Sequence, residues 1–200
     1  MGWFNWFHSS KDYPQFWEEY LARIKKYEDK DKEIYVAFDC ETTGLDPSKD
    51  RLLSIGAVRF TKHSIKVKDS REWYVKQVNT NDESVLIHGI LPSTSAALEL
   101  TEDVAVKTFL DFIGSATLVG HHVNFDIAMI NAVLNRLSAG KLRNKSLDTN
   151  TLFKSEGQFS VEQNFSLDEL CERYKIKTSN RHTALGDAYI TAQIFQRLRQ

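Results

Sequence analysis

The chain has 200 residues, of which 42% are hydrophobic and 26% are charged, and its formal net charge is −1. This length and composition predict one main domain with a buried core, and only three prolines and nine glycines argue against a disordered chain. The near-zero charge excludes a strongly basic protein that coats duplex DNA nonspecifically, but it is compatible with an enzyme that grips a few nucleotides.

Signals for membranes and secretion are missing from the sequence. No apolar run approaches the roughly 20 residues of a membrane-spanning helix, and the first residues lack the basic stretch and the long apolar run of a signal peptide. Cys40 and Cys171 are far apart and have no metal-ligand spacing, so we interpret them as reduced thiols. Together these features predict a cytoplasmic protein without membrane contact.

Residues 1–33 differ in composition from the rest of the chain. An aromatic-rich start precedes a predicted helix over residues 13–27, whose apolar side chains recur every three or four positions. We interpret this segment as an extension of a main domain that covers residues 34–200. The helix would pack on that domain, and the alternative is a docking arm for a polymerase or another protein.

Several β-rich runs follow the extension. Residues 34–38 predict a buried strand that ends in Asp39, and residues 51–60 predict a second strand. Residues 65–67 and 72–78 continue the β character. The short turns between these runs predict an antiparallel meander.

The remainder of the chain alternates between helices and short strands. Helices are predicted over residues 101–113, 125–137, 167–174 and 183–198, and short strands over residues 117–121 and around 147–149. Strands followed by alternating helix and strand are typical of an α/β fold, with a mixed central sheet flanked by helices.

Three separated segments carry carboxylates beside predicted strand or helix ends. Asp39 and Glu41 lie two positions apart, so both side chains face the same side of a strand. Asp126 lies in the first turn of one predicted helix and Asp187 in the first turns of another. Four converging carboxylates would repel strongly unless cations bound between them. Convergence would therefore indicate a metal-dependent phosphoryl-transfer enzyme.

Each segment taken alone also has a simpler interpretation. Paired acids after a strand can be solvated loop residues, and an acid such as Asp126 in a first helical turn is ordinary charge complementation. His121 and His122 could be ligands, although neutral histidines bonded to the backbone are commoner. His182 lies five residues before Asp187, where it could reach over the site or face solvent near a helix cap.

In combination, the segments resemble the motifs of the DEDD superfamily of 3′–5′ exonucleases, in the histidine-bearing, DnaQ-like branch that includes the epsilon-type proofreading domain. The matching motifs are residues 38–45, 121–126 and 182–188, with further landmarks at residues 87–90 and 165–171. The resemblance runs from about residue 34 to the end of the chain. His122 is a departure, because the family commonly has asparagine there, and it affects fine positioning rather than catalysis.

This resemblance implies an RNase H-like exonuclease fold and an active site with two divalent ions, Mg²⁺ or Mn²⁺. The implied metal ligands are Asp39, Glu41, Asp126 and Asp187. His182 is implied as the general base that accepts a proton from the attacking water. The implied product is a nucleoside 5′-monophosphate released from a 3′ end.

The resemblance also implies contacts with the terminal nucleotide. The residues concerned are Thr42, Thr43, Leu45, His88, His122 and Phe125. For Phe125, packing beneath the site is the alternative that we favour over stacking on a base. Basic residues near the predicted site, among them Arg181, could contact phosphates, and solvated surface is the favoured alternative for most of them.

We expect the substrate to be the 3′ end of single-stranded or frayed DNA. The alternatives are an exoribonuclease that trims RNA 3′ ends, a noncatalytic nucleic-acid-binding module on the same scaffold, and a metal hydrolase that acts on nucleotides. The intact acids and His182 disfavour the noncatalytic module. The choice between DNA and RNA depends on the local geometry that reads the 2′-hydroxyl, and both a free-standing and a polymerase-associated enzyme fit the sequence.

Overall fold

The computed structural model describes residues 12–27, 34–76 and 99–199. The aromatic start of the extension and His88 lie outside the described residues. Within the described ranges, no helix combines the length and the apolar character that a membrane span requires.

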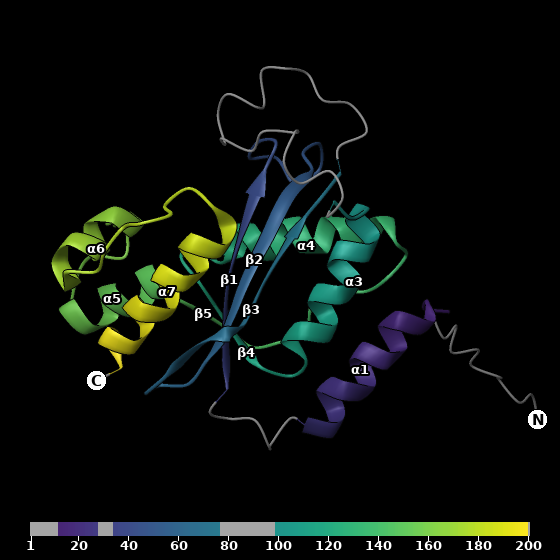
Figure 1. The fold of residues 1–200 in the computed structure, drawn as a ribbon, viewed down its shortest axis with the longest axis horizontal. Coiled ribbons are helices and arrows are strands. Elements are labelled where there is room, and N and C mark those ends of the chain that lie inside the picture. Colours follow the sequence, from purple (N-terminus) through teal and green to yellow (C-terminus); the bar gives the residue numbers. More distant parts are fainter. Residues whose placement is uncertain (1–11, 28–33, 77–98, 200) are drawn as a thin grey trace, which may run out of the picture.

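A mixed five-stranded sheet forms the centre of the fold (Figure 1). Its strands are β1 (Tyr35–Thr42), β2 (Leu52–Phe60), β3 (Ile65–Tyr74), β4 (Thr117–Gly120) and β5 (Ser146–Asp148), in the order β3-β2-β1-β4-β5. The first three strands pair antiparallel, whereas β4 pairs parallel with β1, and β5 pairs parallel with β4. The predicted meander followed by parallel strands is confirmed.

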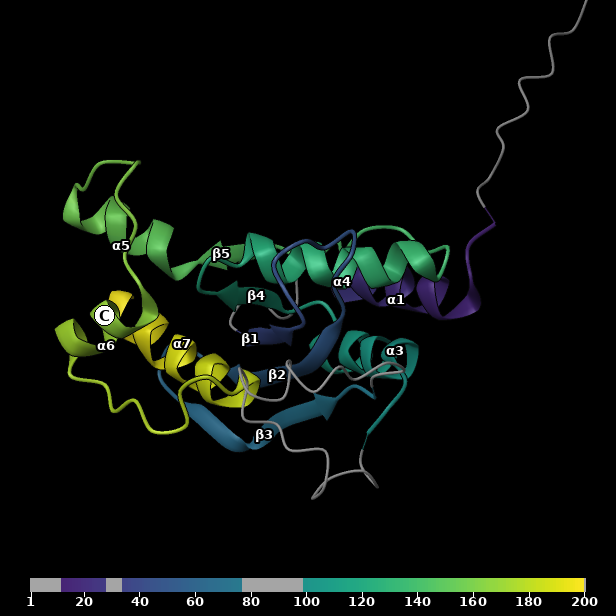
Figure 2. The ribbon, with the colours of Figure 1, turned by 90° about the horizontal axis from the view of Figure 1, so that it is seen from above.

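Helices cover both faces of this sheet (Figure 2). They are α1 (Gln15–Tyr27), α3 (Glu102–Ile113), α4 (Asn124–Arg136), α5 (Thr149–Gly157), α6 (Leu167–Tyr174) and α7 (Ala184–Leu198). One apolar core joins the sheet to α3 and α4, with α1 packed beside them. On the opposite face α7 packs on β1 and β2, and α5 and α6 pack against α7. The predicted α/β class is confirmed.

Strand β1 runs further than the sequence predicts. The predicted strand ends at Asp39, but antiparallel pairing with β2 continues, with Cys40 opposite Ile55 and Glu41 opposite Ser54. Both acids therefore lie inside a rigid strand rather than in the turn after it. The two β-rich runs after β2 likewise form one continuous strand, β3, because both pair with β2.

The helix of the extension is confirmed, and it packs on the main domain. Trp17 and Tyr20 are buried in the same core as the sheet. The Tyr20 hydroxyl donates to Asn144 Oδ1 at 2.6 Å and accepts from the backbone N–H of Arg143 at 2.8 Å. The apolar face of α1 is thus occupied by the fold, as the packing interpretation of this helix predicts.

Candidate metal centre

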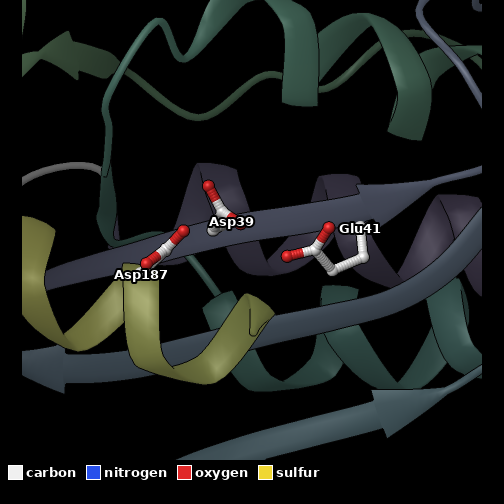
Figure 3. A group of neighbouring side chains, drawn as sticks. All are labelled: Asp39, Glu41 and Asp187. Atoms are coloured by element: carbon white, nitrogen blue, oxygen red, sulfur yellow. The ribbon is translucent and has the colours of Figure 1, made fainter. Parts of the chain in front are cut away.

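Three carboxylates meet on the face of the sheet that α7 covers (Figure 3). Asp39 and Glu41 from β1 and Asp187 from α7 each offer an oxygen, and these oxygens lie within 4.8 Å of one another. The alternation of β1 produces this arrangement, because Phe38 and Cys40 point into the opposite core. The structure therefore brings together three of the four acids that the sequence singles out.

A glycine allows α7 to approach the sheet at this point. Gly56 of β2 lies opposite Asp39. A Cβ atom at Gly56 would lie 2.2 Å from the carbonyl carbon of Ala184 and from the amide nitrogen of Leu185. Any side chain there would push away the first turn of α7, which carries Asp187. The site thus depends on backbone-to-backbone contact as well as on its acids.

The fourth predicted acid, Asp126, lies next to this group rather than within it. Its side chain is buried in the first turn of α4, and its Oδ1 accepts from the backbone N–H of Cys40 at 3.0 Å. Burial raises the pKa of Asp126 above its usual range. Asp126 is therefore more than a surface acid that complements a helix end.

Burial and mutual repulsion among the acids both act on the pKa of Asp39. Burial raises the pKa of Asp39 well above its usual value, and the charges of Asp126, Asp187 and Glu41 raise it further. A bound cation would relieve this repulsion. Among the described residues, Asp187 Oδ1 is also buried without a hydrogen-bond partner. An all-carboxylate donor set with an unpartnered oxygen fits a hard divalent cation.

An arginine that the sequence suggested as solvated surface or a phosphate contact instead lies against the site. Arg181 forms ion pairs with Asp168 of α6 and with Asp187 of α7, and its side chain is only 16% exposed. Arg181 is thus an exception to the solvated role that we favoured for most of the basic residues, because the loop between α6 and α7 turns its guanidinium inward. Sequence reasoning did not single out Asp168, which lies in the first turn of α6.

His182 follows Arg181 and lies on the surface. Its backbone is in the left-handed region, with φ of 61°, and its side chain is exposed. Thr183 then caps α7, because its hydroxyl accepts from the backbone N–H of Gly186 at 3.1 Å. The loop thus carries an exposed imidazole five residues before Asp187.

The loop after β1 carries three of the residues predicted to contact a nucleotide. Thr42 is buried and donates from Oγ1 to the carbonyl of Gly44, whereas the hydroxyl of Thr43 donates to Asp50 Oδ1 at 2.9 Å. Leu45 is 83% exposed. Asp50 therefore ties back a loop that presents an apolar side chain to solvent just after β1.

The remaining predicted contacts belong to the second motif. His122 is exposed, with φ of 58°, and its ring lies edge-on to that of His121. His121 Nε2 lies 2.9 Å from the carbonyl of Phe165, which can only accept, so Nε2 carries the proton and Nδ1 faces the Thr149 hydroxyl. Phe125 packs against the core, which agrees with the packing alternative.

Comparison with known proteins supports a nuclease interpretation of this site. A model of the exonuclease family RNase_T matches residues 36–195. The DNA polymerase III subunit epsilon of Rickettsia prowazekii is 32% identical over 165 residues, which cover 80% of this chain and 71% of that protein. The corresponding subunit of Aquifex aeolicus is 32% identical over 161 residues, with coverage of 80% and 78%.

Longer proteins match the chain over a part of their length. A PolC-type DNA polymerase III of Caldanaerobacter subterraneus is 35% identical over 162 residues, and the matched region is 80% of this chain but 11% of that protein. The structure of E. coli exonuclease I in complex with a dT13 oligonucleotide superposes with a TM-score of 0.70 at 20% identity, covering 84% of this chain and 41% of exonuclease I.

Proposed function

The chain belongs to the RNase_T family of exonucleases, in its DnaQ-like branch and with an RNase H-like fold, and on that premise we propose that its carboxylate group is the site of 3′–5′ hydrolysis of DNA. The observation that carries the proposal is the group of Asp39, Glu41 and Asp187, whose oxygens lie within 4.8 Å of one another. The buried Oδ1 of Asp187, which has no hydrogen-bond partner within the described part of the chain, supports it.

We propose Mg²⁺ or Mn²⁺ as the ions, two per site. Asp39, Glu41 and Asp187 would hold them, and Asp126 adds a fourth negative charge beside these acids. When bound, such ions supply Lewis acidity towards the attacking water and the leaving 3′ oxygen. The chain contributes the fixed oxygens, since β1 and the first turn of α7 are held by the sheet and by the contact at Gly56.

His182 is the proposed general base. It is exposed on the loop that leads into α7, so its ring is free of the core and close in sequence to Asp187. A base must come within about 3 Å of the proton that it removes, and rotation of an exposed side chain can provide that approach once substrate is bound. The hydrolysis would release a nucleoside 5′-monophosphate.

The proposed substrate is a 3′ end of single-stranded or frayed DNA. Leu45 would pack against the terminal nucleotide, with Thr42 and Thr43 beside it, because the loop after β1 presents that leucine to solvent. Single-stranded oligonucleotides are bound in structures of E. coli exonuclease I, which shares the fold. The epsilon relatives are named as polymerase III subunits, so association with a polymerase is part of this proposal, through residues 1–33 outside the buried face of α1.

Asp39→Asn tests the proposal directly. We expect release of nucleotides from a 3′-labelled DNA oligomer to fall at least about 100-fold with Mg²⁺ or Mn²⁺, since one metal ligand loses its charge. Glu162→Gln, which changes an exposed acid outside the site, is the matched control and should cleave normally. Equal cleavage by the Asp39 variant and the wild type would refute the assignment.

Matched oligomers define the substrate in the same experiment. Single-stranded, blunt duplex and frayed DNA are compared with RNA of the same sequence. Faster cleavage of single-stranded or frayed DNA supports the proposed substrate. Faster cleavage of RNA would instead make the chain an exoribonuclease that uses the same carboxylates.

A further inference from the structure

One side chain of the α6–α7 loop links two helices at the site. Arg181 Nε donates to Asp168 Oδ1 at 2.7 Å, and Nη2 donates to Asp168 Oδ2 at 3.1 Å. Nη1 donates to Asp187 Oδ2. The planar guanidinium thus uses one edge for a two-point contact with α6 and its remaining nitrogen for α7.

The acid that receives the two-point contact is well anchored. Asp168 lies in the first turn of α6, where Ser166 and Glu169 form reciprocal capping hydrogen bonds. Leu170 of the same helix is buried in a core that α6 shares with α7. Asp168 therefore presents its carboxylate from a fixed position, and the fork contact fixes the orientation of Arg181.

The contact with Arg181 gives the two oxygens of Asp187 different surroundings. Arg181 occupies Oδ2, while Oδ1 is buried and has no hydrogen-bond partner among the described residues. Asp187 is also one of the three acids whose oxygens cluster within 4.8 Å. An outer hydrogen bond to one oxygen of a metal-binding carboxylate sets the direction of the other.

We propose that Arg181 is a positioning residue: held by Asp168, it orients the Asp187 carboxylate so that Oδ1 is presented to a divalent ion. This inference rests on the proposed function, because it assigns a role within the same site. It makes α6, which contributes no predicted metal ligand, part of the structure that forms the site.

The backbone around Arg181 gives the contact a second effect. Asn180 and His182, on either side, have φ of 66° and 61°, a left-handed conformation that non-glycine residues rarely adopt. The Thr183 hydroxyl bonds the Asn180 carbonyl at 2.8 Å. Anchoring of the Arg181 side chain therefore also restrains the backbone of the loop that carries His182.

Coulomb's law alone predicts the opposite effect on metal binding. A guanidinium beside a cation site repels the cation, so its removal would strengthen metal binding if orientation were unimportant. Loss of a partner that orients a metal ligand instead weakens binding, commonly by about 10- to 100-fold. The sign of the change in metal affinity therefore separates the two effects.

The experiment is a titration of the full chain with Mn²⁺ in the absence of DNA, followed by calorimetry and by the electron paramagnetic resonance signal of free Mn²⁺. We expect Arg181→Met to weaken binding by about 10- to 100-fold. Arg181→Lys should recover only part of this loss, because an ammonium lacks the planar fork that spans two acids. Asp168→Ala should weaken binding in the same direction.

Lys177→Met is the matched control, because it removes an exposed positive charge from the same loop and should leave Mn²⁺ affinity unchanged. Equal or tighter Mn²⁺ binding by both Arg181→Met and Asp168→Ala would overturn the inference. Thermal melting in EDTA checks that each variant is folded. The Asp168 side chain is 58% exposed, so Asp168→Ala should fold and can test the inference even if Arg181→Met unfolds.

A double substitution distinguishes a positioning role of Arg181 from a merely structural one. If Asp168 acts through Arg181, the Asp168→Ala and Arg181→Met losses in Mn²⁺ affinity should not add. A wild-type chain that neither binds Mn²⁺ nor cleaves DNA would refute the proposed function itself. A wild type that does both, with unaltered variants, would refute only the role of Arg181.

Discussion

The two faces of β1 carry out different tasks with neighbouring residues. Phe38 and Cys40 point into the core beneath α3 and α4, whereas Asp39 and Glu41 point towards α7. The apolar face stabilises the fold by burial, and the acidic face costs stability, because burial and then repulsion from the neighbouring acids raise the pKa of Asp39. A single strand thus provides rigidity on one side and a charged site on the other.

Phe38→Ala should show the largest effect on stability. The ring is fully buried and lies 5.3 Å from that of Phe109, so truncation leaves a cavity. We expect a loss of about 3–5 kcal/mol in the free energy of unfolding, measured with denaturant. Folded protein should still bind Mn²⁺, and a small change in stability accompanied by lost binding would contradict the division between the faces.

On the acidic face of β1, Glu41→Gln should lower activity without lowering stability. Removing one carboxylate charge from the group should slow nucleotide release by at least about 100-fold, equivalent to about 3 kcal/mol in the activation barrier. The same change relieves repulsion, so the melting temperature in EDTA should stay equal or rise. Marked destabilisation with normal cleavage would show that Glu41 serves the fold rather than the site.

Gly56→Ala should affect the stability of the fold and the metal site together. The new methyl group would collide with the backbone of Ala184 and Leu185, so the first turn of α7 must move. We expect about 1–3 kcal/mol of destabilisation together with weaker Mn²⁺ binding, measured by denaturation and titration. Gly114→Ala is a matched control for loss of a glycine, because its Cβ would meet nothing within 4 Å, although its positive φ adds some strain.

Acid should destabilise the fold through His121. Burial lowers the pKa of His121 to about 4, below its unfolded value of about 6.5, so the neutral form is favoured in the folded state. Stability from this group is complete above about pH 6.5 and is lost as pH falls towards 4. Because the ring is only partly buried, we expect about 1–2 kcal/mol between pH 7.5 and 4.5.

The His121→Gln variant isolates the contribution of His121 to the pH dependence of stability. The acids with raised pKa values change stability in the opposite direction in metal-free protein, since they favour protonation in the folded state. The wild type and His121→Gln are therefore both denatured in EDTA at pH 7.5 and 4.5. The contribution of the acids is the same in both proteins, so it cancels when their pH dependences are compared. An identical pH dependence in the two proteins would exclude His121 as the sensitive group.

Leu45→Ala should produce the smallest change. The side chain is 83% exposed, so its truncation should alter the free energy of unfolding by less than about 0.5 kcal/mol. If Leu45 packs on the terminal nucleotide, KM for a DNA oligomer should rise several-fold while kcat changes less. Unchanged kinetics would remove Leu45 from the proposed substrate contacts.

The sequence predicts the fold and part of the site for identifiable reasons. Alternation in a strand depends only on neighbouring positions, so it places Asp39 and Glu41 on one side without any knowledge of tertiary structure. Helix signals likewise place Asp187 near the start of α7. The family comparison confirms the exonuclease domain that the combined motifs indicate.

The missed features depend on contacts between distant segments. Helix α5 was not predicted, because its start is fixed by the Asp148 side chain and its packing by burial of Phe153. The Arg181–Asp168 contact requires the loop to fold back across 13 positions. The proximity of Gly56 to α7 is visible only when the helix is in place.

The hydrogen bond of Tyr20 also has a consequence for the order of folding. It joins residues 124 positions apart, so α1 leaves the ribosome long before Asn144 exists to receive it. The core that buries Trp17 likewise includes residues as far along the chain as Ala139, so it is incomplete until most of the chain has been made. Helix α1 should therefore dock late during synthesis, and a nascent chain halted before residue 144 should expose it to proteases and chaperones.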